Sequence, residues 1–157
     1  NKGIIARDLK PDHFLFNSQG QVKLIDFGII HLIPQQQSGI PDLYQTESGA
    51  IIGTRRYMSP EQAKGEDIDP RSDIYSFGIV LYELFTFEPP FTLGDVCYQH
   101  VHDLPVKPRD FNPTIPKALE EIILMCLEKN PDHRPPNALV LKKYFEEFLQ
   151  QYQSETK

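Results

Sequence analysis

The stretch that decides the fold is Ala6-Arg7-Asp8-Leu9-Lys10-Pro11, which is followed at a short distance by Asp26-Phe27-Gly28. Between them lie two short apolar runs, 14–16 and 22–25, and a polar stretch with a turn glycine separates the two runs. This pattern predicts a β-hairpin. The hairpin would hold Asp8 and Asp26 on the two flanks of one small sheet, so that both carboxylates would face the same cleft.

Further motifs follow in a fixed order along the chain. They are Gly53-Thr54-Arg55-Arg56-Tyr57-Met58-Ser59-Pro60-Glu61, Ser72-Asp73-Ile74-Tyr75-Ser76-Phe77-Gly78, Pro89-Pro90-Phe91 and Asn130-Pro131-Asp132-His133-Arg134-Pro135. Together with the first two stretches, they resemble the catalytic loop, metal-binding loop, end of the activation loop, large buried helix, late turn and closing arginine of protein kinases. The sequence at 57–62 and 72–84 is most similar to that of bacterial-type Ser/Thr kinases.

The resemblance covers nearly the whole chain and implies a kinase C-lobe, which is a mainly α fold with a small β-hairpin. We expect residues 1–152 to form part of a kinase domain, from the catalytic loop to the last helix, and residues 153–157 to form a tail. In the family, a Gly-rich loop and a strand lysine bind ATP, and both precede the catalytic loop. Only seven residues precede Asp8, so we expect a C-lobe fragment whose missing partner is the kinase N-lobe.

The composition favours one soluble domain. A hydrophobic fraction of 39% supports a single core in 157 residues, and the net charge of −6 argues against nucleic-acid and anionic-membrane partners. No apolar run approaches the roughly 18–20 residues of a membrane span, and no signal peptide is visible. We therefore expect a cytoplasmic protein, with any membrane anchor of the parent outside this segment. Cys97 and Cys126 fit neither a disulfide framework nor a metal site, and free thiols are expected.

Local signals place one short helix and one loop before the middle of the chain. Ser59, Pro60 and Gln62 predict a helix with a capping box, and Gly65 predicts its end. Residues 29–52 lack periodicity and predict a loop. That loop is either an activation segment or, over its glutamine-rich part, a plain surface connection.

The second half of the chain is predicted to be mostly helical. The run 74–87 is apolar nearly all round, which indicates a helix buried on several sides. The spacing of apolar residues predicts amphipathic helices at 117–129, with Glu120 on the polar face, and at 141–152. Prolines break up the stretch 105–116, which is therefore expected to be an extended loop.

Phosphoryl transfer requires positioned metal ions, a positioned hydroxyl and cations where charge develops. The resemblance implies that Asp8 accepts the proton of a substrate hydroxyl, that Lys10 neutralises charge on the phosphate, and that Asp26 holds Mg²⁺. The order Asp-Leu-Lys-Pro is typical of Ser/Thr kinases, so the implied partners are ATP and protein substrates with Ser or Thr. Without these motifs, each aspartate would be interpreted as a solvated turn carboxylate.

The resemblance also implies a regulatory arginine. Arg7 would pair with a phosphorylated residue of the activation loop, for which Thr46 and Ser48 are the candidates. The alternative for these two positions is an ordinary polar loop. Thr54 would contact Asp8 and Lys10 and shape the substrate-side pocket.

Other motif residues are expected to support the site. Phe27 and Gly28 complete the metal-binding loop. Glu61 and Arg134 would form a buried ion pair between the end of the activation loop and the late helices. Asp73 would accept hydrogen bonds from the backbone of the catalytic loop and hold it in a strained shape.

Two positions depart from the family pattern. Ala6 stands where the family has a His that packs against the Phe of Asp-Phe-Gly. His13 stands where the family has a metal-binding Asn, although Mg²⁺ prefers oxygen ligands to an imidazole. The sequence therefore fits a kinase in which Asp26 holds the metal alone or His13 binds one weakly. The alternatives are a pseudokinase that acts as a binding or scaffolding module and a truncated product with no function of its own. Because Asp8, Lys10 and Asp26 are all present, we favour an active kinase.

Overall fold

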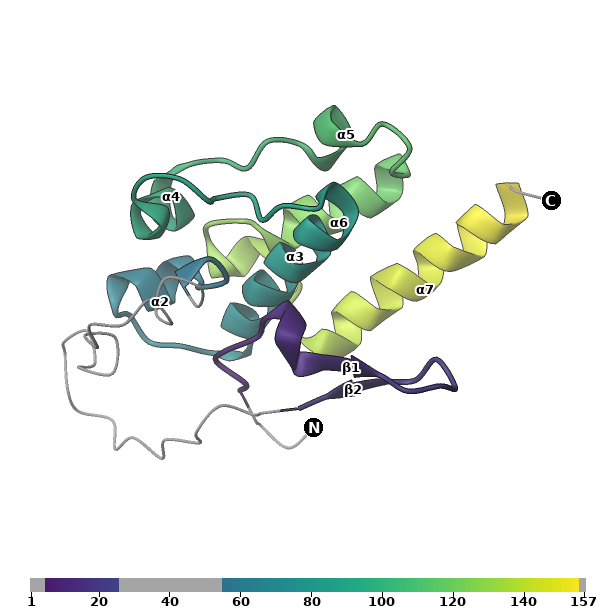
Figure 1. The fold of residues 1–157 in the computed structure, drawn as a ribbon, viewed down its shortest axis with the longest axis horizontal. Helices are drawn as coiled ribbons and strands as arrows, with labels where there is room; N and C mark the ends of the chain where they lie inside the picture. Colours follow the sequence, from purple (N-terminus) through teal and green to yellow (C-terminus); the bar gives the residue numbers. More distant parts are fainter. Residues whose placement is uncertain (1–4, 26–54, 156–157) are drawn as a thin grey trace.

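The computed structural model describes residues 5–25 and 55–155. Along the chain these residues form η1 (Pro11–His13), β1 (Phe14–Phe16), β2 (Val22–Leu24), α2 (Pro60–Lys64), α3 (Pro70–Thr86), α4 (Val96–His102), α5 (Pro108–Phe111), α6 (Lys117–Cys126), η3 (Pro131–His133) and α7 (Ala138–Glu155). Figure 1 shows the helices gathered around α3, with the hairpin below it and the second half of α7 reaching beyond the other elements. The predicted fold class, mainly α with a small β-hairpin, is confirmed.

The β-hairpin forms where the sequence predicts it. β1 and β2 pair antiparallel, with Phe14 opposite Leu24. Asn17 organises the turn, because its side-chain oxygen accepts hydrogen bonds from two later backbone amides, as is typical of Asn in turns. Gly20 has a φ of 74°, in the left-handed region that glycine enters without steric cost. Phe14 packs on Phe77 of α3, with ring centroids 5.9 Å apart, so the hairpin is fixed against the central helix.

The predicted capping box of α2 is confirmed. The Ser59 hydroxyl accepts a hydrogen bond from the Gln62 amide at 3.3 Å, and Gln62 Oε1 accepts one from the Ser59 amide at 2.9 Å. Pro60 occupies the first helical position, and Gly65 follows the helix with a φ of 71°. Local chemistry alone therefore sets both ends of α2.

Helix α3 begins before the predicted run 74–87. Asp69 caps it by accepting a hydrogen bond from the Arg71 amide at 2.7 Å, and Pro70 is its first residue. The capping chemistry therefore adds a polar first turn that the apolar pattern does not include. The middle of α3 is buried, but Leu84 is 64% exposed, so the prediction of a helix apolar and buried on several sides fails for its last turn.

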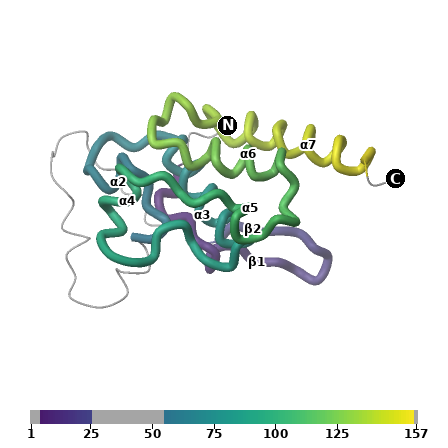
Figure 2. The backbone as a smooth tube through the Cα atoms, turned by 90° about the horizontal axis from the view of Figure 1, so that it is seen from above, coloured from purple at the N-terminus to yellow at the C-terminus, as the bar shows by residue number. Residues whose placement is uncertain are grey.

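The main core lies between α3 and α6. Figure 2 shows α6 and α7 along one side of α3, and α3 packs against α6 while α6 packs against α7. The buried side chains of this core come from α3, from α6 and from the residues on either side of α6. They are Tyr75, Ile79, Leu81, Tyr82, Ile115, Leu119, Ile123 and Leu127.

The late segments differ from the sequence prediction in three respects. The stretch before α6 is not wholly extended, because Pro108 starts the short helix α5. Glu120 does not lie on a polar surface, since it is buried and accepts a hydrogen bond from the Arg109 amide at 2.8 Å. That amide gives the inward-facing carboxylate a partner. Helix α6 ends at Cys126 rather than at residue 129, and α7 continues to Glu155, past the predicted end at residue 152.

At Gly78, α3 comes close to the end of α6. A Cβ atom at this position would lie 2.7 Å from Cβ of Cys126 and 3.1 Å from Cδ2 of Leu127, so the two helices would have to move apart. We expect Gly78→Ala to lower the free energy of unfolding by about 1–3 kcal/mol, although alanine favours a helix over glycine by about 1 kcal/mol.

Urea denaturation followed by circular dichroism measures this change. Leu84→Ala, on the exposed last turn of the same helix, serves as the control and should stay within about 0.5 kcal/mol of the unsubstituted chain. A more stable Gly78→Ala protein, as helix propensity alone predicts, would contradict the close approach of the two helices.

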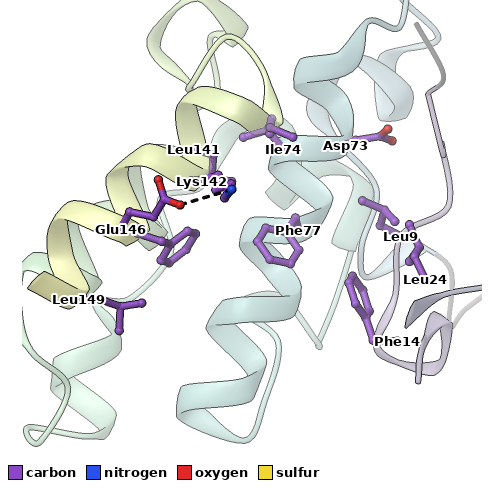
Figure 3. A pocket seen from close by; sticks show the side chains of 12 residues that line it. Leu9, Phe14, Leu24, Asp73, Ile74, Phe77, Leu141, Lys142, Glu146 and Leu149 are labelled. Carbon is purple, nitrogen blue, oxygen red and sulfur yellow. Dashed lines mark ion pairs between the residues drawn. The ribbon is translucent and has the colours of Figure 1, made fainter. Parts of the chain in front are cut away.

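An apolar groove of about 490 Å³ lies between the hairpin, α3 and α7. Figure 3 shows Phe77 of α3 and Leu141 of α7 in its lining, and the ion pair between Lys142 and Glu146, 3.3 Å apart, beside it. Leu9 also lines the groove. The groove therefore lies directly behind the loop that carries the predicted catalytic residues.

The two cysteines are free thiols, as predicted. Burial raises the pKa of the Cys126 thiol to about 12, so this group is protonated at neutral pH. Within residues 5–25 and 55–155, none of the helices combines the length and the apolar character that crossing a membrane requires.

Candidate active site

The backbone of the loop that carries Asp8 is held by two helices. Arg7 has a φ of 65°, which is uncommon for a residue with a side chain and costs free energy. Asp73, in the first turn of α3, accepts hydrogen bonds from the Ala6 amide at 2.7 Å and from the Arg7 amide at 2.8 Å. Gln62 of α2 donates from its side-chain nitrogen to the Arg7 carbonyl at 2.8 Å. Both polar groups of the Arg7 backbone are therefore fixed immediately before Asp8.

Asp73 makes the contacts that the sequence suggested, at a cost in desolvation. Its carboxylate is half-buried, and this burial raises its pKa above the usual value. The amides of Ala6 and Arg7 and the charge of Arg7 act in the opposite direction without outweighing burial. A carboxylate whose pKa is perturbed by burial is typical of functional sites, and the two hydrogen bonds of Asp73 hold the backbone of the loop.

Sequence reasoning missed the second role of Gln62. The capping box uses only the side-chain oxygen of Gln62, which leaves the amide nitrogen to donate to the Arg7 carbonyl. A glutamate at this position would lack that donor. The presence of Gln rather than Glu at position 62 could therefore have indicated a further hydrogen bond from this side chain, although it does not identify the acceptor.

Asp8 and Lys10 lie side by side. The Lys10 Nζ is 3.7 Å from the Asp8 Oδ2, and the two side chains are 27% and 32% exposed. Both groups can thus reach a bound substrate. A carboxylate that can accept a proton beside an ammonium that can stabilise developing negative charge suits group transfer to a hydroxyl.

His13 is built into the back of the same loop. It is 6% exposed, and its Nδ1 lies 2.7 Å from the Asp8 carbonyl oxygen. Because a carbonyl only accepts hydrogen bonds, Nδ1 carries the proton. The His13 amide donates to the Lys10 carbonyl at 3.0 Å, and its own carbonyl accepts from the Ile25 amide at 2.9 Å. His13 therefore joins the loop that carries Asp8 to Ile25, which follows β2 and directly precedes Asp26.

Of the two positions that the family implies as magnesium ligands, only His13 lies among the described residues. His13 could offer a metal only a ring nitrogen, which suits transition metals better than Mg²⁺. Over 5–25 and 55–155, no group of three or more His, Cys, Asp or Glu side chains could hold a metal ion. The other predicted site residues lie outside the described residues, and their roles stay predictions: Asp26, Phe27, Gly28, Thr46, Ser48 and Thr54.

Glu61 and Arg134 form a buried bidentate ion pair. Arg134 Nη1 donates to Glu61 Oε1 at 2.8 Å, and Nη2 donates to Oε2 at 2.9 Å. Burial alone would raise the pKa of Glu61, but the hydrogen bonds from Arg134 and Ser72 outweigh it, so the pKa lies below its usual value. The remaining donors of Arg134 reach the backbone carbonyls of Arg71, Glu128 and Lys129. The pair thus joins α2 to the segments around α3 and η3.

Comparisons of the sequence with known proteins show which family the chain belongs to. The family described as protein kinase domain matches residues 1–146. The chain is 46% identical over 140 residues to a probable serine/threonine-protein kinase of Streptomyces coelicolor, a match that covers 87% of this chain and 20% of that protein. It is 42% identical over 144 residues to the serine/threonine-protein kinase PknB of Mycolicibacterium smegmatis, covering 89% of this chain and 22% of PknB.

A third relative is the DNA damage-responsive serine/threonine-protein kinase RqkA of Deinococcus radiodurans, which is 41% identical over 143 residues, covering 88% of this chain and 20% of RqkA. The chain therefore spans about a fifth of the length of the curated relatives it matches. Since one family accounts for residues 1–146 and all three relatives are named as kinases, the chain belongs to the protein kinase family.

Proposed function

We propose that this chain forms the C-lobe of a Ser/Thr protein kinase, which transfers the γ-phosphoryl group of ATP to protein Ser or Thr hydroxyls. The observation that carries the proposal is the pair Asp8 and Lys10, 3.7 Å apart on a loop whose backbone Asp73 holds. The names of the relatives support the substrate class. ATP, Mg²⁺, a kinase N-lobe and protein substrates are the partners typical of such an enzyme.

Asp8 and Lys10 divide the chemistry between them. Asp8 orients the substrate hydroxyl and accepts its proton while the hydroxyl oxygen bonds to the γ-phosphorus and the bond to the bridging oxygen breaks, releasing ADP. Lys10 places its ammonium where negative charge collects on the transferred group. Asp73 and Gln62 take no part in bond changes, but they fix the backbone from which Asp8 projects.

Arg7 is proposed to regulate the loop. A phosphate on Thr46 or Ser48 would carry about −1.5 to −2 charge and would pair strongly with the guanidinium of Arg7. We expect phosphopeptides that cover 46–48 in mass spectra of the active full-length protein, and we expect Arg7→Ala to abolish the activation that follows phosphorylation. A fully active protein without modification at Thr46 and Ser48 would exclude this role.

A pseudokinase is the second candidate function, and His13 is the observation that favours it. The imidazole is buried behind the catalytic loop, where the family pattern has an oxygen ligand for a metal. In this alternative the fold would act as a binding or scaffolding module, and it would bind partners without transferring phosphate.

The test uses the full-length protein of the gene that encodes this chain, incubated with γ-labelled ATP, Mg²⁺ and a mixture of protein substrates. Phosphoamino-acid analysis should find the label on Ser and Thr. ATP binding without any transfer would support the pseudokinase instead. The 157 residues expressed alone should give no transfer, because they contain no Gly-rich nucleotide loop of the pattern G-x-G-x-x-G.

His13→Asn is expected to raise turnover about tenfold, which corresponds to ~1.4 kcal/mol of transition-state stabilisation. An Asn amide nitrogen can take the place of the His13 Nδ1 and keep the bond to the Asp8 carbonyl, while its oxygen becomes a ligand that suits Mg²⁺. Steady-state kinetics at several Mg²⁺ concentrations would measure the gain.

The control is His133→Asn, because His133 also ends a short Pro-Asp-His helix but lies at the surface in η3. It should leave turnover unchanged. If His13→Asn gave the same turnover as His133→Asn while ATP binding stayed intact, His13 would not be the defect that limits activity.

A further inference from the structure

A buried histidine on α4 has no part in the site described above. His100 is 0% exposed, and its ring contacts the rings of Phe91 and Tyr75 edge-on, with centroids 5.1 and 5.7 Å away. Buried polar atoms need hydrogen-bond partners. The partners of the two ring nitrogens therefore show what this imidazole holds together.

The hydrogen bonds fix the tautomer of His100. Its Nε2 is 3.0 Å from the Arg55 carbonyl oxygen, which can only accept, so Nε2 carries the hydrogen. Its Nδ1 is 3.0 Å from the Tyr75 hydroxyl. The Lys129 ammonium donates to that same hydroxyl at 3.3 Å, so the hydroxyl hydrogen is directed to Nδ1. Each group thus donates a hydrogen bond to the next: the ammonium to the hydroxyl, the hydroxyl to the imidazole, and the imidazole to the carbonyl.

The groups in this chain of hydrogen bonds are held firmly. Lys129 also donates to the carbonyls of Gln99 and His100 at 3.1 and 2.8 Å, and its ammonium lies 4.6 Å from the centre of the Phe91 ring. Burial, assisted by the charge of Lys129, lowers the pKa of His100 to about 4. The imidazole is therefore neutral at physiological pH, and its Nε2–H remains directed at Arg55.

The carbonyl that His100 holds belongs to a functional segment. Arg55 directly follows Thr54, which is proposed to shape the substrate-side pocket. The same carbonyl accepts a hydrogen bond from the Met58 amide at 3.4 Å, which leads the chain into the Ser59 cap of α2. The bond from His100 is thus a long-range contact that ties α4 to the backbone between Thr54 and α2.

We propose that His100 is a positioning residue for protein substrates. Its Nε2–H holds the Arg55 carbonyl and so sets the position of the backbone beside Thr54. The substrate segment that contains the hydroxyl to be phosphorylated docks against this backbone. The proposal rests on the proposed kinase function and names a determinant of its substrate binding. His100 contacts neither ATP nor the reacting atoms, so its loss should weaken substrate binding and leave the chemical step unchanged.

Two amide substitutions distinguish the ring nitrogens. In His100→Gln the amide nitrogen lies near the position of Nε2 and can still donate to Arg55, whereas in His100→Asn the shorter amide reaches only the position of Nδ1. Loss of one hydrogen bond predicts that His100→Asn raises KM for a protein substrate about fivefold or more. We expect kcat and the KM for ATP to stay within about twofold, and His100→Gln to restore the KM for the protein substrate.

Hydrogen exchange measured by mass spectrometry provides a readout that needs no catalysis. In the full-length protein, the amides of 55–58 should exchange about fivefold faster in His100→Asn than in His100→Gln. Equal exchange rates in the two variants overturn the positioning role. An equal KM for the protein substrate in the two variants of an active kinase overturns it as well. Faster exchange in a protein whose unsubstituted form transfers no phosphate overturns the proposed function instead, and the substrate role with it.

A further variant keeps the test decisive if His100→Asn does not fold. His100→Met has a side chain of similar length but no hydrogen-bond donor, so the Arg55 carbonyl loses its bond to residue 100. A raised KM for the protein substrate, with the KM for ATP unchanged, is expected there as well. An unchanged KM for the protein substrate in His100→Met would overturn the proposal.

Discussion

Replacing Arg134 by alanine is expected to lower the free energy of unfolding by about 3–5 kcal/mol. The substitution leaves the Glu61 carboxylate, which is 5% exposed, with Ser72 as a hydrogen-bond donor but without its opposite charge. It also removes the donors that satisfy three backbone carbonyls. Equilibrium urea denaturation at neutral pH, followed by circular dichroism, would measure the loss.

Arg71→Ala is the matched control, because it removes the same side chain from a more exposed pair of contacts. Arg71 lies 2.6 Å from carboxylate oxygens of both Asp69 and Asp132, which are closer contacts than those of Arg134. Ion pairs open to solvent nevertheless contribute at most about 1 kcal/mol. If the two substitutions cost the same, burial would not be the origin of the effect.

The double substitution Glu61→Leu with Arg134→Met separates lost charge compensation from lost packing. An apolar pair of similar volume removes the uncompensated carboxylate, and such replacements of buried ion pairs are often neutral or stabilising. We therefore expect the double variant to be more stable than Arg134→Ala. Equal instability would show that the packing of the arginine stem dominates.

The structure confirms the sequence predictions where contacts between neighbouring residues determine the local conformation. The turn at Asn17 and Gly20 and the ends of α2 each depend on side chains within four residues of one another. Their residue types are sufficient to predict them. The resemblance to a family supplied long-range contacts, such as that of Asp73 with the catalytic loop, which spacing alone does not reveal.

The prediction for Glu120 was wrong, and no long-range partner was predicted from the sequence for Gln62 or His100. Glu120 faces inward because the Arg109 amide lies beside it, and Gln62 holds the backbone of Arg7, 55 residues away. His100 is buried in α4 because Tyr75 and Arg55 satisfy its ring. A sequence pattern classes such residues as polar, and only the folded chain shows that their polarity is satisfied inside.

Asp8→Asn is expected to lower the turnover of the full-length protein by about 10²–10⁴-fold. An amide of the same shape cannot accept the proton of the substrate hydroxyl, so the step that Asp8 is proposed to assist loses its base. The free energy of unfolding should change by no more than about 0.5 kcal/mol. Asp73 and Gln62 set the loop through the backbone, and within residues 5–25 and 55–155 the Asp8 carboxylate makes one ion pair, the partly exposed contact with Lys10.

The measurement is phosphate transfer under single-turnover conditions, with ATP binding and urea denaturation recorded on the same protein. Asp12→Asn provides the control, because it removes an equal charge from an exposed position four residues along the same loop, and we expect its turnover to stay within about threefold. An equal loss in both variants would trace the effect to the charge of the loop rather than to proton transfer. An Asp8→Asn protein with full turnover would exclude Asp8 as the base, because Asn cannot take up the proton at neutral pH.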